Sequence, residues 1–256
     1  MDGQWFRRFG TPEPDAVRLI CFPHAGGSAS AYGPLSRLLP PHLEVRAVQY
    51  PGRQDRRLEP PVDGIRELAA AIAERLPADD DRPWAFFGHS MGALLAYETT
   101  RVLQERQAPA PVRLFLSGRG APALRADPHD APPDDEAILT AVRRLGGTGA
   151  QLLDDPELVA MVLPALRADY RALAAYSWTP GAPLDVPITV LCGADDPVVA
   201  VPDAAGWRAQ TRAGAEVRVF SGGHFYLDQH LGEVAEVIVR GVRSAVAGRV
   251  GNGARA

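Results

Sequence analysis

Six short, strongly apolar runs alternate along the chain with longer stretches whose apolar residues recur every three or four positions. The short runs are rich in β-branched and aromatic residues, and most have no polar face, which is typical of strands buried on both sides. The longer stretches have the spacing of helices that cover a sheet. The expected strands are 17–22, 43–49, 83–88, 112–118, 187–193 and 216–222, and the expected helices are 63–76, 92–106, 202–211 and 232–246. This order predicts an α/β fold with a mostly parallel sheet and right-handed crossovers.

The alternation is interrupted once, between the expected strands at 112–118 and 187–193. The connection is far longer than one crossover helix needs. It begins with a lead rich in Pro and Asp, RADPHDAPPDDE, and continues with two expected helices, EAILTAVRRLGG and PELVAMVLPALRADYRALAAYSW. We therefore expect an inserted helical lid with a glycine hinge. The resulting division is 1–120 and 181–250 for the core, 121–180 for the lid, Gly146, Gly147 and Gly149 for the hinge, and 251–256 for a disordered tail.

The sequence GHSMG at 88–92 lies where the expected strand WAFFG meets the expected helix MGALLAYE. A strand that runs directly into a sharp turn and a helix places the central serine, Ser90, at the apex. A glycine on each side removes the Cβ atoms that would collide in such a turn. The Gly-x-Ser-x-Gly pattern alone is weakly specific, but in this context it predicts that Ser90 is a nucleophile.

A serine hydroxyl becomes a good nucleophile only when a neighbouring base accepts its proton and a third group orients that base. Of the six histidines, His224 in FSGGHFYL directly follows the last expected strand, so we expect it at the same sheet edge as Ser90. Two acids, Asp195 and Asp196, follow the preceding strand in VLCGADDPVV. The spacing Gly-x-x-Asp, found in many enzymes with such a turn, favours Asp196, with Asp195 as the alternative. The expected triad is Ser90, Asp196 and His224.

Two backbone N–H groups are expected to bind the negative oxygen that forms when a carbonyl is attacked. The first belongs to Met91, which follows the nucleophile at the start of a helix. The second belongs to Ala25, because CFPHAGGSAS follows the first apolar strand and its Ala-Gly-Gly run lets the backbone approach a substrate. An ordinary tight turn is the alternative for this loop, and His24 is expected to be only a structural neighbour.

Apolar residues of the expected lid offer a pocket for an apolar substrate group. The candidates are Met161, Leu166 and Tyr170, and the alternative is that each simply packs on the core. Both possibilities place a helix face against the sheet domain, so the sequence leaves them open.

Composition argues against several other functions. The 256 residues carry a net charge of −4, which provides no general attraction to nucleic acid. No leader-like segment and no run of about 20 apolar residues is found, so we expect a cytoplasmic protein without a membrane span. Nothing in the sequence indicates a metal or an organic cofactor, and we expect a monomer.

Several sequence blocks together resemble the type II thioesterases that accompany modular polyketide and nonribosomal peptide synthases. The blocks are WFRRF, LICFPHAGGSASAY, QYPGRQDR, GHSMGALLAYE, FLSGRGAP, GADDPV and GGHFYL, and they extend from near the start of the chain to the final helix. The resemblance implies an α/β-hydrolase core with a helical lid, which removes aberrant or stalled acyl groups from the phosphopantetheine arms of acyl or peptidyl carrier proteins. It implies that the nucleophile, acid and base are Ser90, Asp196 and His224 and that the oxyanion N–H groups are those of Ala25 and Met91.

Without the resemblance, the residues indicate a serine hydrolase that acts on an acyl ester or thioester. A carboxylesterase or an acyltransferase of the same fold is therefore the alternative, depending on whether water or another acceptor takes the acyl group. A non-catalytic protein that binds carrier domains is the alternative from another class, and the complete triad argues against it.

Overall fold

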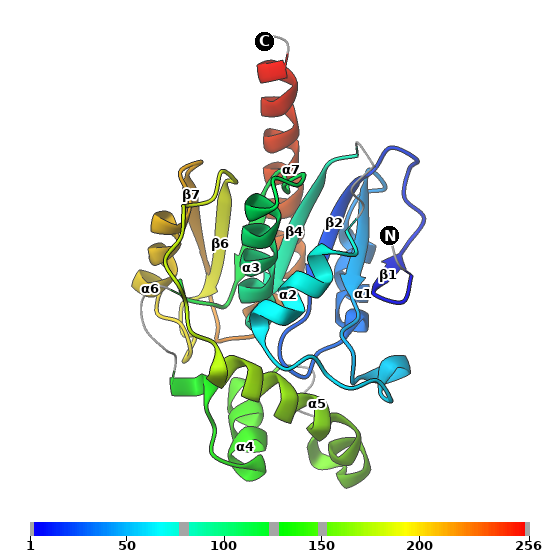
Figure 1. Cartoon of the computed structure of the whole chain (residues 1–256), viewed down its shortest axis with the longest axis vertical. Coiled ribbons are helices and arrows are strands. Elements are labelled where there is room, and N and C mark those ends of the chain that lie inside the picture. The colour runs from blue at the N-terminus through cyan, green and yellow to red at the C-terminus, as the bar shows by residue number, and fades with distance from the viewer. Residues whose placement is uncertain (1–2, 77–81, 123–127, 148–152, 254–256) are drawn as a thin grey trace.

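The computed structural model describes residues 3–76, 82–122, 128–147 and 153–253. Within them, seven strands form one sheet in the order β1-β3-β2-β4-β5-β6-β7 (Figure 1). Neighbouring strands are parallel except for β1, which runs antiparallel to β3. The strands are β1 Phe6–Phe9, β2 Val17–Phe22, β3 Leu43–Val48, β4 Trp84–His89, β5 Leu114–Ser117, β6 Ile188–Gly193 and β7 Ala215–Phe220.

All six predicted strands are confirmed, and their ends lie within two residues of the expected positions. The additional strand, β1, has only four residues and pairs on one side, so its sequence FRRF has too little apolar pattern to reveal it. The inner strands are almost fully buried, as their continuous apolar runs indicate. The mostly parallel α/β fold is therefore confirmed.

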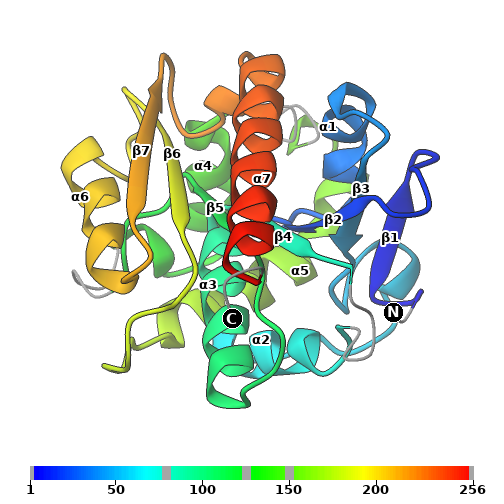
Figure 2. The same cartoon turned by 90° about the horizontal axis from the view of Figure 1, so that it is seen from above.

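Helices cover both faces of the sheet (Figure 2). On one face α2 Ile65–Ala73 and α3 Met91–Glu105 pack in a large apolar cluster, together with the short α6 Val201–Ala205. On the other face α1 Gly33–Leu38 and α7 Leu231–Gly253 pack in a second cluster. In the described part of the chain, no helix is both long enough and apolar enough to cross a membrane.

Two expected helices differ most in extent from the observed ones. The helix expected at 202–211 ends as α6 at Ala205 and continues as a 3-10 helix, Gly206–Gln210. This 3-10 helix contains the fully buried Trp207, whose indole N–H donates to the carbonyl oxygen of Arg119 at 2.8 Å. The helix expected at 232–246 is longer and spans Leu231–Gly253, and the rest of the expected tail, 254–256, lies outside the described residues. No proline interrupts this segment, and the backbone hydrogen bonds therefore continue.

The long connection between β5 and β6 contains the 3-10 helix Pro128–Asp130 and the helices α4 Asp135–Leu145 and α5 Pro156–Ala175. Figure 1 shows α4 and α5 together below the sheet, beyond one end of its strands. Asp134 and Asp155 cap the first turns of α4 and α5, respectively. Two of the expected hinge residues, Gly146 and Gly147, end α4 with positive φ, and Gly149 lies outside the described residues.

We predict opposite effects of alanine at two glycines of α7. A Cβ at Gly241 would lie 2.8 Å from the ring of the buried Phe115, whereas a Cβ at Gly248 would meet no atom within 4 Å. Gly241→Ala is expected to reduce the free energy of unfolding by about 1–3 kcal/mol through overpacking. Gly248→Ala is expected to raise it by about 0.5–1 kcal/mol through helix propensity. Urea unfolding monitored by circular dichroism measures both, and equal effects would contradict the packing described for α7.

Candidate active site

Ser90 occupies a strained turn between β4 and α3. Its φ of 56° and ψ of −119° lie outside the usual regions for a residue with a side chain. Its N–H donates to the carbonyl oxygen of Ser117 at the end of β5, at 2.8 Å. The side chain is half-buried. The backbone therefore holds Ser90 at the apex of the turn, where the sequence predicted it.

The two glycines around Ser90 permit close backbone contacts. A Cβ at Gly88 would lie 2.1 Å from the carbonyl oxygen of Gly92. A Cβ at Gly92 would lie 1.9 Å from the carbonyl oxygen of Phe22, at the end of β2. Any other residue at either position would force the turn apart, so the glycines bring the start of α3 against the end of β2.

Asp196 and His224 form a buried pair beyond β6 and β7. The Nδ1 atom of His224 lies 3.0 Å from Oδ2 and 3.1 Å from Oδ1 of Asp196. The side chain of His224 is 1% exposed and that of Asp196 is fully buried. The Asp196 carboxylate also accepts the N–H of Val198 at 2.8 Å. In contrast, Asp195 is exposed, so the structure pairs His224 with Asp196 and not with the alternative acid.

A close backbone approach brings these two loops together. A Cβ at Gly193, the last residue of β6, would lie 2.3 Å from the carbonyl oxygen of Gly223 and 2.4 Å from that of Gly222. Because Gly193 has no Cβ, the loop that contains His224 can lie directly against the loop that contains Asp196.

His224 also lies close to the turn that holds Ser90. Its ring centroid is 4.9 Å from that of His89, the residue before Ser90. A Cβ at Gly118 would lie 3.3 Å from Cε1 of His224 and 2.6 Å from Cε1 of His89, so all three residues meet at the end of β5. The three side chains of the predicted triad thus come from loops at the same edge of the sheet.

Burial favours the neutral state of two imidazoles near His224, those of His24 and His89. His24, His89 and His224 all lie within 5.3 Å of the Phe225 ring, measured between ring centroids. Burial, and then the nearby His224, lowers the pKa of His24 from 6.5 to about 4. The same two causes lower the pKa of His89 well below 6.5. His89 Nδ1 lies 2.9 Å from the hydroxyl of Ser117, which fixes its ring at the side of the turn.

The two predicted oxyanion donors border the same region. Met91 is fully buried at the start of α3, and Ala25 is half-buried in the loop after β2. Within the described residues, neither N–H donates to a protein acceptor. The next N–H in the loop is occupied, because Gly26 donates to the Asp169 carboxylate at 2.7 Å. The structure therefore leaves these two predicted N–H groups available to a ligand.

The predicted pocket residues on α5 have different environments. Leu166 and Tyr170 are buried, and Leu166 lies directly over Gly26, where an added Cβ would be 2.4 Å from Leu166 Cδ2. Met161 is 68% exposed, so the structure does not bring it together with the other two. It precedes Pro164 in the first part of α5, on a turn that faces solvent.

Sequence reasoning missed a buried ion pair that contacts the loop of Ala25. The guanidinium of Arg53 donates to both carboxylate oxygens of Asp169, at 2.9 and 2.8 Å. One signal in the sequence could have revealed it: Asp169 is a charged residue on the apolar face of α5, between Leu166 and Leu173. A charge at such a position is rarely buried without a partner.

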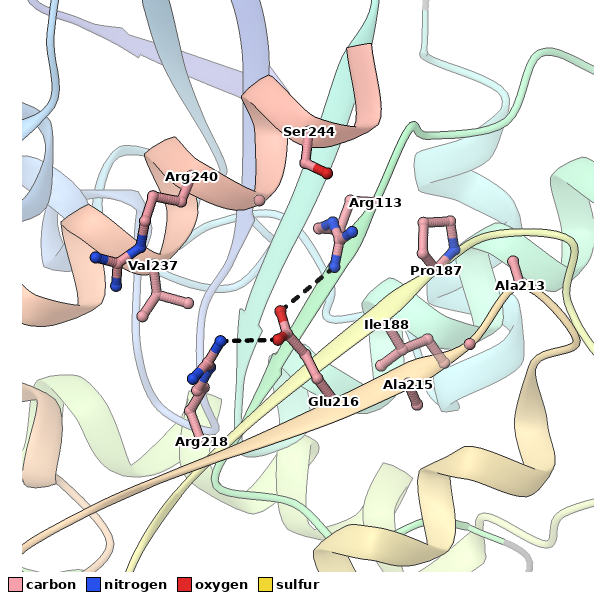
Figure 3. Close-up of a pocket in the computed structure, with 12 residues that line it drawn as sticks. Arg113, Pro187, Ile188, Ala213, Ala215, Glu216, Arg218, Val237, Arg240 and Ser244 are labelled. Atoms are coloured by element: carbon pink, nitrogen blue, oxygen red, sulfur yellow. Dashed lines mark hydrogen bonds and ion pairs between the residues drawn. The ribbon is translucent and has the colours of Figure 1, made fainter. Parts of the chain in front are cut away.

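A hollow of about 420 Å³ lies at the opposite edge of the sheet, between α7 and the starts of β6 and β7 (Figure 3). Two of its arginines pair with Glu216, Arg218 at 2.9 Å and Arg113 at 3.6 Å. It contains none of the residues predicted for catalysis. Within the described residues, no group of three or more His, Cys, Asp or Glu side chains could hold a metal ion.

The chain is similar to several known proteins. The family model described as the thioesterase domain matches residues 17–241. A probable cadicidin biosynthesis thioesterase of Streptomyces griseus is 48% identical over 231 residues, which cover 90% of this chain but only 64% of that relative. Thioesterase PikA5 of Streptomyces venezuelae is 45% identical over 237 residues, covering 92% of this chain and 84% of the relative. The solved structure of the type II thioesterase BorB from the borrelidin biosynthetic cluster has a TM-score of 0.85 and 42% identity, covering 93% of this chain and 97% of that one.

The lowered histidine pKa values predict a loss of stability in mild acid. Because the pKa of His24 is lower in the folded state than its ordinary value of 6.5, the unfolded chain binds more protons between these values. The free energy of unfolding is therefore not reduced by His24 above about pH 6.5, and it decreases as the pH falls towards 4. His24→Gln is expected to weaken this pH dependence by about 1–3 kcal/mol. Urea unfolding from pH 7 to 4 measures it, and identical slopes in both proteins would contradict the prediction.

Proposed function

The chain belongs to the thioesterase family, and on that basis we propose that it hydrolyses acyl thioesters on the phosphopantetheine arms of acyl or peptidyl carrier proteins. The observation that best supports this function is the buried pair of Asp196 and His224 beside the turn that holds Ser90. A thioester is suited to such a site because its carbonyl is electrophilic and its thiolate leaves readily. The reaction therefore proceeds through an acyl-serine intermediate, without a cofactor.

In the first half of the proposed reaction, the acyl group moves to the enzyme. His224 has its Nδ1 beside Asp196, so the proton stays on Nδ1 and the Nε2 lone pair accepts the proton of the Ser90 hydroxyl. The Ser90 oxygen attacks the thioester carbon, and the C=O electron pair moves to oxygen. When this pair returns, the C–S bond breaks, and the thiolate takes the proton from His224 Nε2. The arm leaves as a free thiol.

In the second half, water releases the acyl group. His224 Nε2 accepts a proton from water, the resulting oxygen nucleophile attacks the acyl-serine carbon, and the C–O bond to Ser90 breaks. Ser90 recovers its proton from His224, and the product is a carboxylic acid. In both halves the N–H groups of Met91 and Ala25 bind the negative oxygen. Such preorganised donors contribute about 10²–10³-fold to the rate in comparable sites.

We further propose that residues 121–180 act as a lid and that the protein meets its carrier partner in the cytoplasm. The position of α5 over the loop of Ala25 supports a lid, because Leu166 and Asp169 both contact Gly26. Removal of aberrant or stalled acyl groups is the proposed role, since several relatives belong to polyketide or peptide biosynthesis.

We predict that Ser90→Ala abolishes hydrolysis of acyl-carrier thioesters. Loss of the nucleophile is expected to reduce kcat by about 10³-fold or more, while the melting temperature changes little because Ser90 is half-buried and its side chain makes no capping hydrogen bond to α3. Carrier domains loaded with short or long acyl groups are weighed by mass spectrometry before and after incubation. A variant that retains more than about a tenth of the wild-type rate would exclude Ser90 as the nucleophile. An oxoester of the same acyl group, hydrolysed faster than the carrier thioester, would favour a carboxylesterase.

We also predict that substitutions of the two neighbouring acids, Asp195 and Asp196, differ in their effect on kcat. Asp196→Asn is expected to lower kcat by about 10²–10⁴-fold, because the amide cannot support the imidazolium of His224 and favours the wrong tautomer. Asp195→Asn is the matched control and is expected to change kcat less than about threefold, since Asp195 is exposed. The kcat values of both variants on one activated ester decide between them, and a larger loss in Asp195→Asn would move the acid by one residue.

A further inference from the structure

We propose that the Arg53–Asp169 ion pair positions the oxyanion-binding loop, so that a residue of α5 controls how the Ala25 N–H meets the substrate. Arg53 lies in the loop after β3, and Asp169 lies on α5 in the long connection between β5 and β6. This inference rests on the proposed function, because it assigns a role to residues behind the proposed oxyanion donor. Neither side chain is a catalytic residue, since neither reaches the reacting atoms.

The pair binds the loop at two points, one on each side of the peptide unit that joins Gly26 and Gly27. Asp169 Oδ2 accepts the N–H of Gly26 at 2.7 Å, directly after the proposed donor Ala25. Arg53 Nη1 donates to the carbonyl oxygen of Gly27 at 2.9 Å. The same Oδ2 and Nη1 atoms also bind each other at 2.9 Å. The four groups thus form a closed network in which the backbone at 26–27 cannot shift without breaking a charged hydrogen bond.

Apolar and aromatic side chains also hold the loop and Arg53 in place. Gly26 has a φ of 73°, and an added Cβ would lie 2.4 Å from Leu166, one turn before Asp169 on α5. The Arg53 guanidinium also lies 4.9 Å from the centroid of the Tyr50 ring, and the Tyr50 hydroxyl donates to the carbonyl oxygen of Pro23 at 3.1 Å. The loop is therefore held at several points, whereas the N–H of Ala25 is left without a protein acceptor among the described residues.

Stability alone is a poor explanation for this pair. Its side chains are only 5% and 6% exposed, and removing two charges from water costs about as much as their attraction returns. Apolar residues of similar size often stabilise a protein as well as such a pair does. A positioning role explains the charges better. The carboxylate accepts hydrogen bonds from a backbone N–H and from two nitrogens of the guanidinium at once, which fixes the distances between these groups and their orientation.

The test separates positioning from stability with two variants. Arg53→Met combined with Asp169→Leu removes both charges and keeps the site filled, so we expect its melting temperature to fall less than that of Asp169→Asn, which leaves a buried charge without its partner. The same variant leaves Gly26 N–H without its acceptor, so we expect kcat on a 4-nitrophenyl ester to fall about 10–100-fold. Affinity for an acyl trifluoromethyl ketone, which forms an oxyanion on Ser90, is expected to fall equally, while affinity for a nonhydrolysable acyl-pantetheine amide stays unchanged.

The single substitution Asp169→Asn is expected to show the reverse pattern. The amide oxygen can still accept Gly26 N–H, so ketone affinity stays within about threefold of the wild type, whereas the buried Arg53 loses its charge partner and the melting temperature falls. The matched control is Arg101→Met with Glu98→Leu, which removes another buried ion pair, on α3, with side chains 9% and 4% exposed. We expect this control to keep its ketone affinity.

Three results would overturn the proposal: wild-type ketone affinity in the Arg53/Asp169 double variant, an equal loss in the control, or a greater loss in Asp169→Asn than in the double variant. If the double variant does not fold, the comparison of Asp169→Asn with the control still decides, because a loss of ketone affinity in Asp169→Asn beyond threefold contradicts the proposal. The ester and the ketone require only a serine nucleophile. A wild-type protein that fails on acyl-carrier thioesters would therefore overturn the proposed function without affecting this test.

Discussion

The meeting of several loops at one edge of the sheet depends on positions where no Cβ atom fits. Gly92 lies against the backbone of Phe22, Gly88 lies against Gly92, and Gly193 lies against the backbone before His224. Each contact lets two main chains approach more closely than any side chain allows. The strained conformation of Ser90 and the short distance between Asp196 and His224 depend on this close approach of the main chains. The sheet holds these main chains in place.

The buried charged side chains around the site are bound to specific partners, as Asp196 is to His224 and Arg53 is to Asp169. Burial lowers the pKa values of His24 and His89, so these two side chains add little positive charge near Ser90. Asp196 is surrounded by donors, namely His224 and the N–H of Val198. A low-dielectric environment strengthens each of these contacts and penalises any group left unpaired. The same physical rule explains why Arg53 and Asp169 are buried only together.

Local patterns predicted most of the fold and part of the site. The six strands follow from continuous apolar runs, and the turn at Ser90 follows from glycine positions next to a strand and a helix. The Gly-x-x-Asp spacing favoured Asp196 and left Asp195 as the alternative, and the structure pairs His224 with Asp196 and leaves Asp195 exposed. The ion pair of Arg53 with Asp169 joins residues 116 positions apart, and no local periodicity encodes such a contact. Likewise, the exposure of Met161 depends on how α5 packs, which its own sequence does not specify.

The contacts of Asp169 also limit how the segment between β5 and β6 can change during evolution. A surface insertion is usually free to diverge, and transplanting one from a relative would normally alter only substrate preference. Here one carboxylate of that insertion belongs to the same hydrogen-bonded network as Arg53 and Gly26 in the core. We therefore expect residues 53 and 169 to change together, and we expect a chimera that exchanges the insertion to keep its activity only if the donor sequence supplies a side chain at position 169 that accepts the Gly26 N–H.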